Sequence, residues 1–460
     1  MSRPITARTL LWGLVWAALA LGACSKGTSS SSTPGGPTPT PSVSPTVGPS
    51  STPPPSTSGV AYLPDSGDGR PPGITILHFE EFNGAAFPYT PQFANFRSPV
   101  RFLAIDPSDT TALAVLQSPA NAYTLLQGVL GVSSATIFPG GPPYDTSVVP
   151  PSPAPPNAVI ANITGEVMLG TGNNAVGLSV GPGTAGILGV NQAAQQTPTY
   201  NGFVGFTCNG RTPSSSAPVA IAVSPVVNSQ SGDYSLLIRT SNDLLSFSVA
   251  PQFGVVPPKY AICYQVQNTA LGSNTLTLPS VAGRGIMAFS PTDPSRAFLG
   301  QVGTVTNDVA VVSGLPFAIT PTTALALTGG RVNSVAVSPN GLYGAVATDA
   351  GLFVISGLGT SSLAIVPQGA GKTKGPYSPN YKGADGVYHP VANVTSLGFS
   401  SDGLYLAALV SLVPNSPGGG TMGTLVVLPF NSSTGVLAAP AVTNNNLPLT
   451  AYYQDVLTVR

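Results

Sequence analysis

One phrase recurs along this chain: an apolar strand, a turn of the Ser-Pro-Asn-Gly type, and a second apolar strand. Sharp copies begin at Gly285, Val332 and Val394, with the sequences GIMAFSPTDPSRAFLG, VNSVAVSPNGLYGAVAT and VTSLGFSSDGLYLAALV. Looser copies begin at Arg101 and Pro218. The phrase returns about every 50 to 65 residues, a period close to that of propeller blades. Such a repeat constrains the architecture and leaves the chemistry open.

The phrase predicts strands joined by tight turns. Segments such as SVAVS, LYGAVAT and LFVISG are short and apolar, and Gly, Asn, Asp or Pro separates them. The turn sequences Pro339-Asn340-Gly341 and Ser401-Asp402-Gly403 contain residues that tolerate the backbone angles of a reversal. The repeated Asn and Asp residues are therefore predicted to form turns rather than to bind ligands, and the domain is predicted to be all-β.

The number of repeats predicts a β-propeller of seven blades, with six or eight as alternatives. Between Val159 and Gly181, VIANITGEVMLG and AVGLSVG supply a sixth unit beside the five phrases. A seventh can be assembled from both ends, because ITILHFEEF from Ile74 lacks an inner strand and the final DVLTVR from Asp455 lacks partners. Pairing of the N- and C-terminal strands would then close the ring and remove exposed edges.

The C-terminal repeats carry a family resemblance. SSDGLYLAAL followed by LVVLPFNSSTGVL resembles the seven-bladed YVTN and lactonase-like propellers, sharply from Val332 to Pro440 and in pattern over most of residues 60–460. The resemblance implies a propeller fold, in groups that include sugar-lactone hydrolases and many exported propellers without a known reaction. No set of positions matches the acidic and amide side chains of the metal-dependent lactonases, so no catalytic or metal residue is assigned.

Residues 1–23 are predicted to be a lipoprotein signal peptide. Arg3 and Arg8 precede an apolar stretch from Leu10 to Ala23, the layout of a secretory signal. The stretch ends at Leu21-Gly22-Ala23-Cys24, which resembles the bacterial lipobox, and this resemblance implies lipidation of Cys24. Several acyl chains on one Cys would anchor the chain stably to a membrane. The alternative is an ordinary secreted protein in which Cys24 is incidental.

The next segment, residues 24–59, is predicted to be a disordered tether. It consists mainly of Ser, Thr, Pro and Gly and has too few apolar residues to offset the entropy of ordering. Ser25 stands where lipoproteins of a Gram-negative inner membrane typically carry Asp, so the resemblance favours the outer membrane or the cell surface. Residues 60–460 then form the propeller domain.

Charge and cysteine content exclude several classes of function. The 460 residues contain 16 basic and 16 acidic side chains, so electrostatic capture of nucleic acid is not expected. His78 and His389 are the two histidines of the chain, and no cofactor or metal site is predicted. Cys208 and Cys263 lie about one repeat apart, which predicts a disulfide in an oxidising compartment, with two separate buried thiols as the alternative.

The most unusual segment of the domain runs from Pro367 to Pro390. It holds three of the five lysines, three tyrosines and one of the two histidines. It joins an outer strand to the next inner strand, so it is predicted to lie at the mouth of the channel, with tyrosine rings for a sugar or peptide and lysines for an anionic group. The alternative is a solvated insertion whose tyrosines pack on its own backbone. The candidate ligand-binding residues are Lys372, Lys374, Tyr377, Tyr381, Lys382, Tyr388 and His389.

The favoured functional interpretation is a lipid-anchored extracytoplasmic propeller that binds a protein or carbohydrate partner through one face and has no chemistry of its own. One alternative is a lactonase-like hydrolase acting in the propeller channel, which would need acidic or amide side chains converging there. The other is a structural component of a cell-envelope assembly, which would present a contiguous exposed apolar patch.

Overall fold

The structure is a computed structural model. It describes residues 59–65, 73–78, 92–95, 100–105, 111–116, 122–127, 138–139, 144–145, 163–168, 174–181, 184–191, 199–205, 218–240, 243–249, 259–265, 286–303, 305–382, 387–411, 423–440, 442–444 and 458–459. Side chains are described at 61–62, 222–239, 244–248, 286–303, 305–382, 387–410, 424–440 and 459. The predicted signal peptide, Cys24, most of the tether and Cys208 lie outside the described residues. Residues Pro54–Arg460 form one compact unit.

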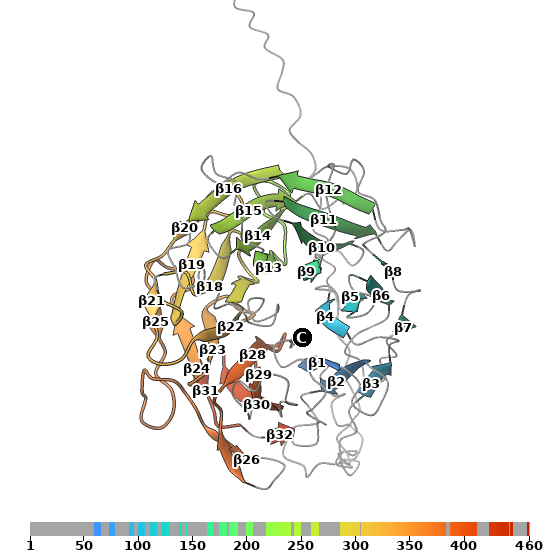
Figure 1. The fold of residues 1–460 in the computed structure, drawn as a ribbon. Coiled ribbons are helices and arrows are strands. Elements are labelled where there is room, and N and C mark those ends of the chain that lie inside the picture. The colour runs from blue at the N-terminus through green and yellow to red at the C-terminus, as the bar shows by residue number, and fades with distance from the viewer. Residues whose placement is uncertain are drawn as a thin grey trace, which may run out of the picture. The chain divides into compact units, whose positions relative to one another are not determined.

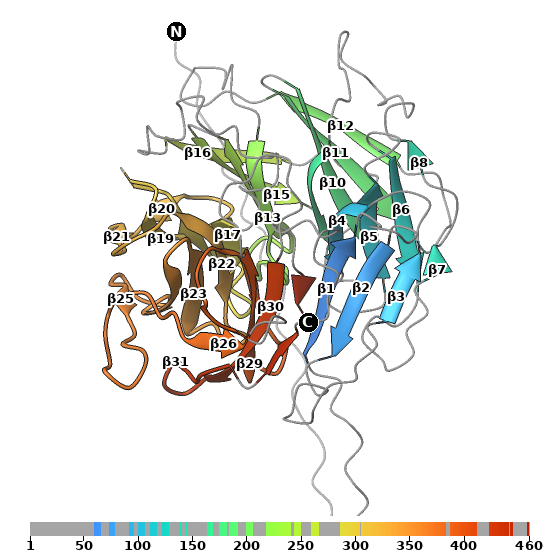
Figure 2. The same ribbon diagram turned by 60° about the horizontal axis from the view of Figure 1, so that its bottom comes forward.

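The strands form antiparallel sheets that follow one another along the chain. One sheet contains Thr458–Val459 (β33), Val60–Asp65 (β1), Gly73–His78 (β2) and Gln92–Asn95 (β3). The next contains Val100–Ile105 (β4), Thr111–Leu116 (β5), Ala122–Gln127 (β6), Phe138–Pro139 (β7) and Tyr144–Asp145 (β8). A third sheet contains Ile163–Met168 (β9), Asn174–Gly181 (β10), Thr184–Asn191 (β11) and Thr199–Gly205 (β12). A fourth contains Pro218–Val223 (β13), Tyr234–Thr240 (β14), Asp243–Val249 (β15) and Lys259–Gln265 (β16). In Figure 2, β1, β2 and β3 lie as neighbouring strands.

The C-terminal half continues the pattern. One sheet contains Met287–Phe289 (β17), Arg296–Gly300 (β18), Asp308–Ser313 (β19), Thr320–Pro321 (β20) and Leu325–Ala326 (β21). The next sheet contains Val332–Val337 (β22), Tyr343–Thr348 (β23), Gly351–Ser356 (β24) and Ala364–Ile365 (β25). A two-stranded hairpin follows, Asn380–Lys382 (β26) and Tyr388–Pro390 (β27). The last sheet contains Val394–Phe399 (β28), Tyr405–Ser411 (β29), Gly423–Asn431 (β30), Val436–Leu437 (β31) and Val442–Asn444 (β32).

These sheets confirm the all-β prediction for the described residues. Each recurring phrase forms the first two strands of a sheet, namely β4–β5, β13–β14, β17–β18, β22–β23 and β28–β29. First strands of successive sheets contact one another, as β9 with β13, β13 with β17, β17 with β22, and β22 with β28 (Figure 1). Within the described part, no helix is long and apolar enough to cross a membrane.

The turn residues of the phrase bond to their own backbone, as predicted. In the turn after β22, Oδ1 of Asn340 accepts the Leu342 amide at 3.0 Å and the Ser338 hydroxyl at 2.7 Å, and Ser338 Oγ accepts the Tyr343 amide at 3.0 Å. Ser400, Asp402, Leu404 and Tyr405 repeat the same three bonds after β28 at 2.9, 2.6 and 3.0 Å. A side chain that mimics a backbone turn is the physical reason for these residue types.

Each sheet has two ends. The end that carries the turns from the first to the second strand and from the third to the fourth strand, such as 338–342 and 357–363, is called the hairpin end. The connection end carries the turns from second to third strand, such as 349–350, and the links to the next sheet, such as 366–393. Antiparallel order places these turns alternately at opposite ends.

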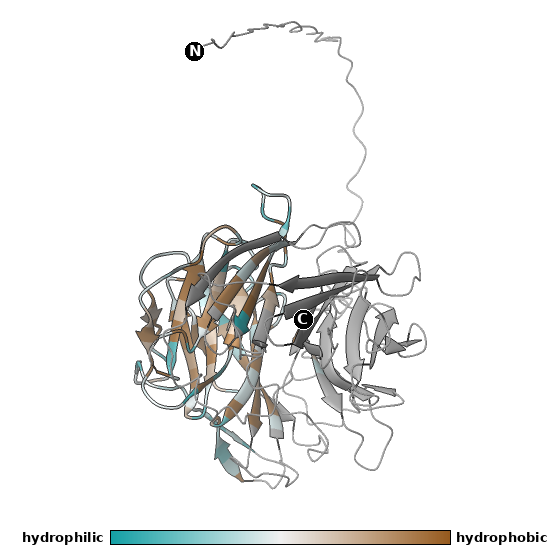
Figure 3. Ribbon diagram, turned by 45° about the horizontal axis from the view of Figure 1, so that its top comes forward, coloured by the Kyte–Doolittle hydropathy of each residue, from teal (hydrophilic) through white to brown (hydrophobic). Residues whose placement is uncertain are grey.

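The core lies between adjacent sheets. One cluster joins β17–β21 to β22–β25, and another joins β22–β25 to β28–β32. Strand residues of these sheets are mostly apolar, whereas hydrophilic residues gather in turns and in the β26–β27 hairpin (Figure 3). Burying each Val, Leu or Phe here contributes roughly 1.5 to 3 kcal/mol. The sheets are therefore fixed to each other along their faces, and their ends remain available for function.

Candidate functional site

The link between β25 and β28 carries all seven predicted ligand-binding residues. Its β26–β27 hairpin pairs Tyr381 with His389 and Lys382 with Tyr388. At its base, the Val391 amide donates to Pro379 O at 2.9 Å. The backbone of the link is therefore hydrogen-bonded on both sides of residues 383–386, which lie outside the described residues.

Tyr381 anchors this hairpin in the protein. Its side chain is only 2% exposed and belongs to the apolar cluster between β22–β25 and β28–β32, together with Leu352, Val391 and Val394. The His389 ring lies over it at a centroid distance of 5.9 Å and an interplanar angle of 39°. A buried aromatic ring of this size contributes several kcal/mol, so the hairpin is held against two sheets at once.

The other two tyrosines lie in different surroundings. The backbone of Tyr377 pairs with Leu352, donating to Leu352 O at 2.7 Å and accepting from Leu352 N at 3.0 Å, so it extends the edge of β24. Its ring is half-buried, and burial raises the pKa of the Tyr377 phenol. Tyr388 is 68% exposed. The three tyrosines are therefore not displayed as a set, and Tyr388 presents most of its ring to solvent.

Lys372 and Lys374 lie in and beside a tight turn next to the outer strand β25. Gln368 and Thr373 close the turn with two backbone bonds of 2.9 and 3.1 Å, and Lys372 adopts a left-handed φ of 45°. The buried Gln368 amide fixes the turn to the neighbouring sheet by donating to Gly435 O at 2.9 Å and accepting from the Leu437 amide at 2.8 Å. Both lysines are exposed, and Lys382 is exposed on the hairpin.

Arg331 lies where β22 begins, at the same end of the sheets. Its Nε donates to Asn333 Oδ1 at 3.2 Å, and Asn333 Nδ2 donates to Asp349 Oδ1 at 2.8 Å and to Val394 O at 2.9 Å. A register shift next to Asn333 recurs near the start of β4, β13 and β28. Bulges of this kind re-aim side chains and are common beside functional sites. Sequence reasoning missed Arg331, Asn333 and Asp349. The signal that could have found Arg331 and Asn333 is their position at the start of a first strand that recurs along the chain.

A buried arginine lies further along the same end. Arg239, at the end of β14, is fully buried, and its guanidinium donates to Gln301 O at 2.6 Å and to Gly300 O at 3.4 Å in the next sheet. Asp308 is 2% exposed and accepts the Val302 amide at 2.8 Å. No hydrogen-bond partner of Arg239 Nε exists among the described residues. The two buried charges attract each other, which partly offsets the loss of their solvation.

Burial dominates the ionisation of this pair. Desolvation lowers the pKa of Arg239 to about 10, and the nearby Asp308 charge opposes that change. Desolvation also raises the pKa of Asp308, against the effect of backbone N–H groups and of Arg239. Sequence reasoning missed this pair, because an arginine near a strand end is ordinarily exposed.

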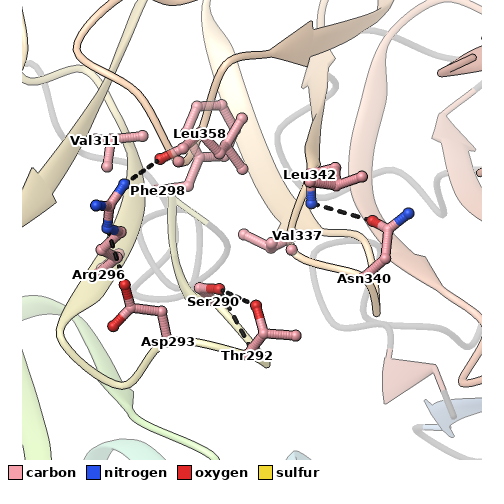
Figure 4. A pocket seen from close by; sticks show the side chains of 13 residues that line it. Ser290, Thr292, Asp293, Arg296, Phe298, Val311, Val337, Asn340, Leu342 and Leu358 are labelled. Atoms are coloured by element: carbon pink, nitrogen blue, oxygen red, sulfur yellow. Dashed lines mark hydrogen bonds and ion pairs between the residues drawn. The ribbon is translucent and has the colours of Figure 1, made fainter. Parts of the chain in front are cut away.

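A pocket lies at the hairpin end, between β17–β21 and β22–β25 (Figure 4). Its volume is about 260 Å³. Arg296 and Asp293 lie on one side and Asn340 and Leu342 on the other. The polar and apolar residues that complete the lining include Ser290, Thr292, Phe298, Val311, Val337 and Leu358. The repeated turns themselves therefore form the rim of this pocket.

Two other predictions concern metal binding and a disulfide. The described residues contain no group of three or more His, Cys, Asp or Glu side chains arranged to hold a metal ion. Cys263 lies in β16, but Cys208 and the side chain of Cys263 lie outside the description, so the predicted disulfide stays a prediction.

Comparison with known proteins shows the fold. No protein-family model and no curated protein matches the chain. A solved structure described as a candidate 6-phosphogluconolactonase from Bacteroides fragilis is 12% identical, and the match covers 90% of this chain and 100% of that one with a TM-score of 0.54. A second such structure, from Bacteroides uniformis, is 14% identical over 88% and 100% of the two chains, also with a TM-score of 0.54.

A third likeness is a hypothetical selenium-binding protein from Sulfolobus tokodaii. It is 9% identical, and the match covers 87% of this chain and 92% of that one with a TM-score of 0.51. At such low identities these likenesses concern the fold and not the reaction. The chain therefore has a β-propeller fold similar to that of lactonase-like structures.

Proposed function

We propose that this chain is a lipid-anchored, extracytoplasmic propeller that binds a carboxylate-bearing partner through the link between β25 and β28. The proposal takes the propeller to have seven blades and to be closed by its two terminal strands. In support, β33 pairs with β1, with Ala61 opposite Val459 and Tyr62 opposite Thr458, and contacts both β28 and β4. The Val459 side chain also packs where a Cβ on Gly398 of β28 would stand.

The anchoring part of the proposal rests on the sequence. Leu21-Gly22-Ala23-Cys24 has the lipobox pattern, and the following Ser, Thr, Pro and Gly residues suit an extended spacer. Lipidated Cys24 would hold the domain at the outer membrane or the cell surface. Mass spectrometry of the N-terminal peptide of the mature chain tests this directly, because acylation adds the mass of each acyl chain to Cys24.

One observation carries the binding proposal: a firmly anchored segment exposes cationic and aromatic side chains. Tyr381 and Gln368 are each 2% exposed and fix the segment to two sheets. Outside those anchors, the lysines and Tyr388 face solvent. The stretch 367–390 contains three lysines and one aspartate, so its surface attracts anions. Fixed positions reduce the entropy that binding would cost.

The test uses the full-length chain and two probes, polygalacturonate and polyglutamate, with neutral dextran as the ligand control. Replacing Lys372, Lys374 and Lys382 together with Gln removes three exposed charges, each contributing about 0.5 kcal/mol. We expect roughly tenfold weaker binding of whichever polyanion binds, and a weaker dependence on salt. The two probes distinguish a carbohydrate from a protein partner.

Arg331→Gln is the matched single variant, since Arg331 lies at the same end of the sheets but outside the link. It should leave binding within about twofold. Equal binding by the triple variant, or no binding of either polyanion, would contradict the proposed surface. Hydrolysis of glucono-δ-lactone by the unmodified chain would contradict a propeller without chemistry and favour the hydrolase.

A further inference from the structure

The pocket at the hairpin end has a counterpart position in the next pair of sheets, which allows a direct comparison. The first residue of the second strand is fixed by the same backbone bond in three sheets: Ser290 N to Arg296 O, Ser338 N to Tyr343 O, and Ser400 N to Tyr405 O, at 3.0, 2.8 and 3.0 Å. Arg296 therefore stands where the two following sheets have tyrosine.

Between β22–β25 and β28–β32, this space is filled. The Tyr343 ring meets Phe430 edge-on at a centroid distance of 5.9 Å, and Phe430 packs on Phe399 at 4.8 Å. The Tyr343 hydroxyl donates to Ser433 O at 3.0 Å in the next sheet. Three aromatic rings thus close the joint at the hairpin end.

Between β17–β21 and β22–β25, none of these three rings has an aromatic counterpart: Arg296 stands in the place of Tyr343, and Val337 in the place of Phe399. Tyr343 lies opposite Ser356 and Tyr405 opposite Pro429, so the residue that corresponds to Phe430 is Gly357. Arg296 keeps the bond to the next sheet, because its Nη1 donates to Leu358 O at 3.3 Å. It does not fill the volume that a tyrosine–phenylalanine pair fills, and the pocket remains.

Arg296 is held in place rather than free to move. Its Nε forms an ion pair with Asp293 Oδ2 at 2.9 Å, and Asp293 Oδ1 accepts the Ser295 amide and hydroxyl at 2.9 and 2.6 Å. The side chains of Arg296 and Asp293 are 33% and 38% exposed. Among the described residues, no partner of Arg296 Nη2 is recorded. A fixed donor and a fixed acceptor therefore stand side by side at the rim.

The remaining lining defines what such a site would accept. The Ser290 and Thr292 hydroxyls lie 3.2 Å apart and add two further donor and acceptor groups. Phe298, Val311 and Val337 supply an apolar surface. Because Asp293 neutralises Arg296, an anion gains little here. A ligand with adjacent hydroxyls on one edge and C–H groups on one face fits this combination.

We propose that this pocket binds a neutral sugar ring, such as the terminal residue of a saccharide. Arg296 and Asp293 bind two vicinal hydroxyls, Thr292 binds a third, and the ring face packs toward Val337. The volume of about 260 Å³ suits a single ring. The lining of this pocket shares no residue with the proposed polyanion surface, so the site does not depend on that surface.

Arg296→Tyr is the decisive variant, because it restores the residue found at the same place in the next two sheets. It fills the pocket while supplying a hydroxyl donor toward the next sheet, so folding is expected to survive. Saturation-transfer NMR on the full-length chain would measure binding of D-glucose, D-galactose, D-mannose and N-acetyl-D-glucosamine. At least one sugar should bind the unmodified chain with a Kd near or below about 1 mM, and Arg296→Tyr should weaken it at least tenfold.

Two controls keep the test informative. Thr292→Val removes a hydroxyl with little change of shape and should weaken the same sugar several-fold with an unchanged melting temperature. Arg331→Tyr, at the connection end, should leave sugar binding unchanged. The proposal is wrong if none of the four sugars binds below about 10 mM, if Arg296→Tyr binds as the unmodified chain does, or if the phosphorylated form of the bound sugar binds more tightly than the sugar.

Discussion

The two ends of the sheets are joined by different kinds of residue. At the hairpin end, a side chain in or directly after the first-to-second-strand turn donates to a turn of the next sheet at the three joints from β13–β16 to β28–β32. Asn228 Nδ2 donates to Leu315 O at 3.1 Å, and Asn340 Nδ2 donates to Ser432 O at 3.0 Å. These donors belong to the repeated phrase, or lie directly after it, and are neutral apart from Arg296 with its ion pair.

At the connection end, the joints use residues that do not repeat. Arg239 reaches Gln301 O, and the buried Gln301 side chain then donates to Val332 O at 2.6 Å in the following sheet. Gln301 itself has a left-handed φ of 57°. A buried charge and an uncommon backbone conformation have a cost in free energy that a regular turn does not have. The difference indicates that the repeat specifies the joints at the hairpin end, whereas the joints at the connection end differ from sheet to sheet.

The largest effect is expected from Arg239→Ala at the connection end. Removing this side chain leaves the Asp308 carboxylate buried without its counter-charge and deprives two backbone carbonyls of their donor. Such a loss costs about 3 to 5 kcal/mol. The midpoint of urea unfolding would fall markedly. Arg331→Ala, a partly exposed arginine at the same end, is the matched control and should change stability by less than about 1 kcal/mol.

A double variant sharpens this result. Arg239→Met with Asp308→Asn removes both charges, so it should recover much of the stability lost in Arg239→Ala. If the double variant is less stable than the single one, the hydrogen bonds of the arginine matter more than the buried charge, and the contrast between the two ends is smaller than stated.

A smaller effect is expected at the hairpin end from Asn340→Asp. The new residue keeps the acceptor for Leu342 N and matches the natural Asp402 of the next sheet, but it loses the donor to Ser432 O. One net hydrogen bond contributes about 0.5 to 1.5 kcal/mol. Asn340→Ala loses the turn bonds as well and should cost more. Unchanged urea unfolding in Asn340→Asp would mean that the joint relies on apolar packing alone.

The contrast between the two ends also explains what the sequence could predict. Alternating strands and the Ser-Pro-Asn-Gly turns are local signals, so the hairpins and the turn role of Asn340 and Asp402 followed from them. The pocket depends on which residue of one sheet faces which residue of the next. The exchange of tyrosine for Arg296 was visible in the aligned phrases, but its partner at Gly357 became visible only through the strand register.

The candidate link illustrates a second limit. Residues 367–390 have unusual composition, which predicted a special surface, but no periodicity that separates buried from exposed side chains. Tyr381 and Tyr388 look alike in the sequence, yet one is buried and the other is 68% exposed. Arg239 shows the same limit, because burial of a charge depends on partners in another sheet that local sequence does not reveal.

The smallest predicted effect concerns pH and again separates the two ends. Desolvation raises the pKa of Asp308, although backbone N–H groups and Arg239 act in the opposite direction. The folded chain therefore binds this proton more readily than the unfolded chain does. Its favourable contribution to the free energy of unfolding is complete below the ordinary Asp pKa near 4 and is lost as pH rises through the raised value.

Urea unfolding between roughly pH 3.5 and pH 7 would measure this for the unmodified chain and for Asp308→Asn. Other carboxylates titrate in both proteins, so the difference between their free energies of unfolding isolates Asp308. Relative to the variant, the unmodified chain should lose stability as pH rises. The opposite slope would mean that hydrogen bonds and Arg239 outweigh desolvation in the folded state. The connection end would then resemble the hairpin end, as a joint that polar contacts stabilise.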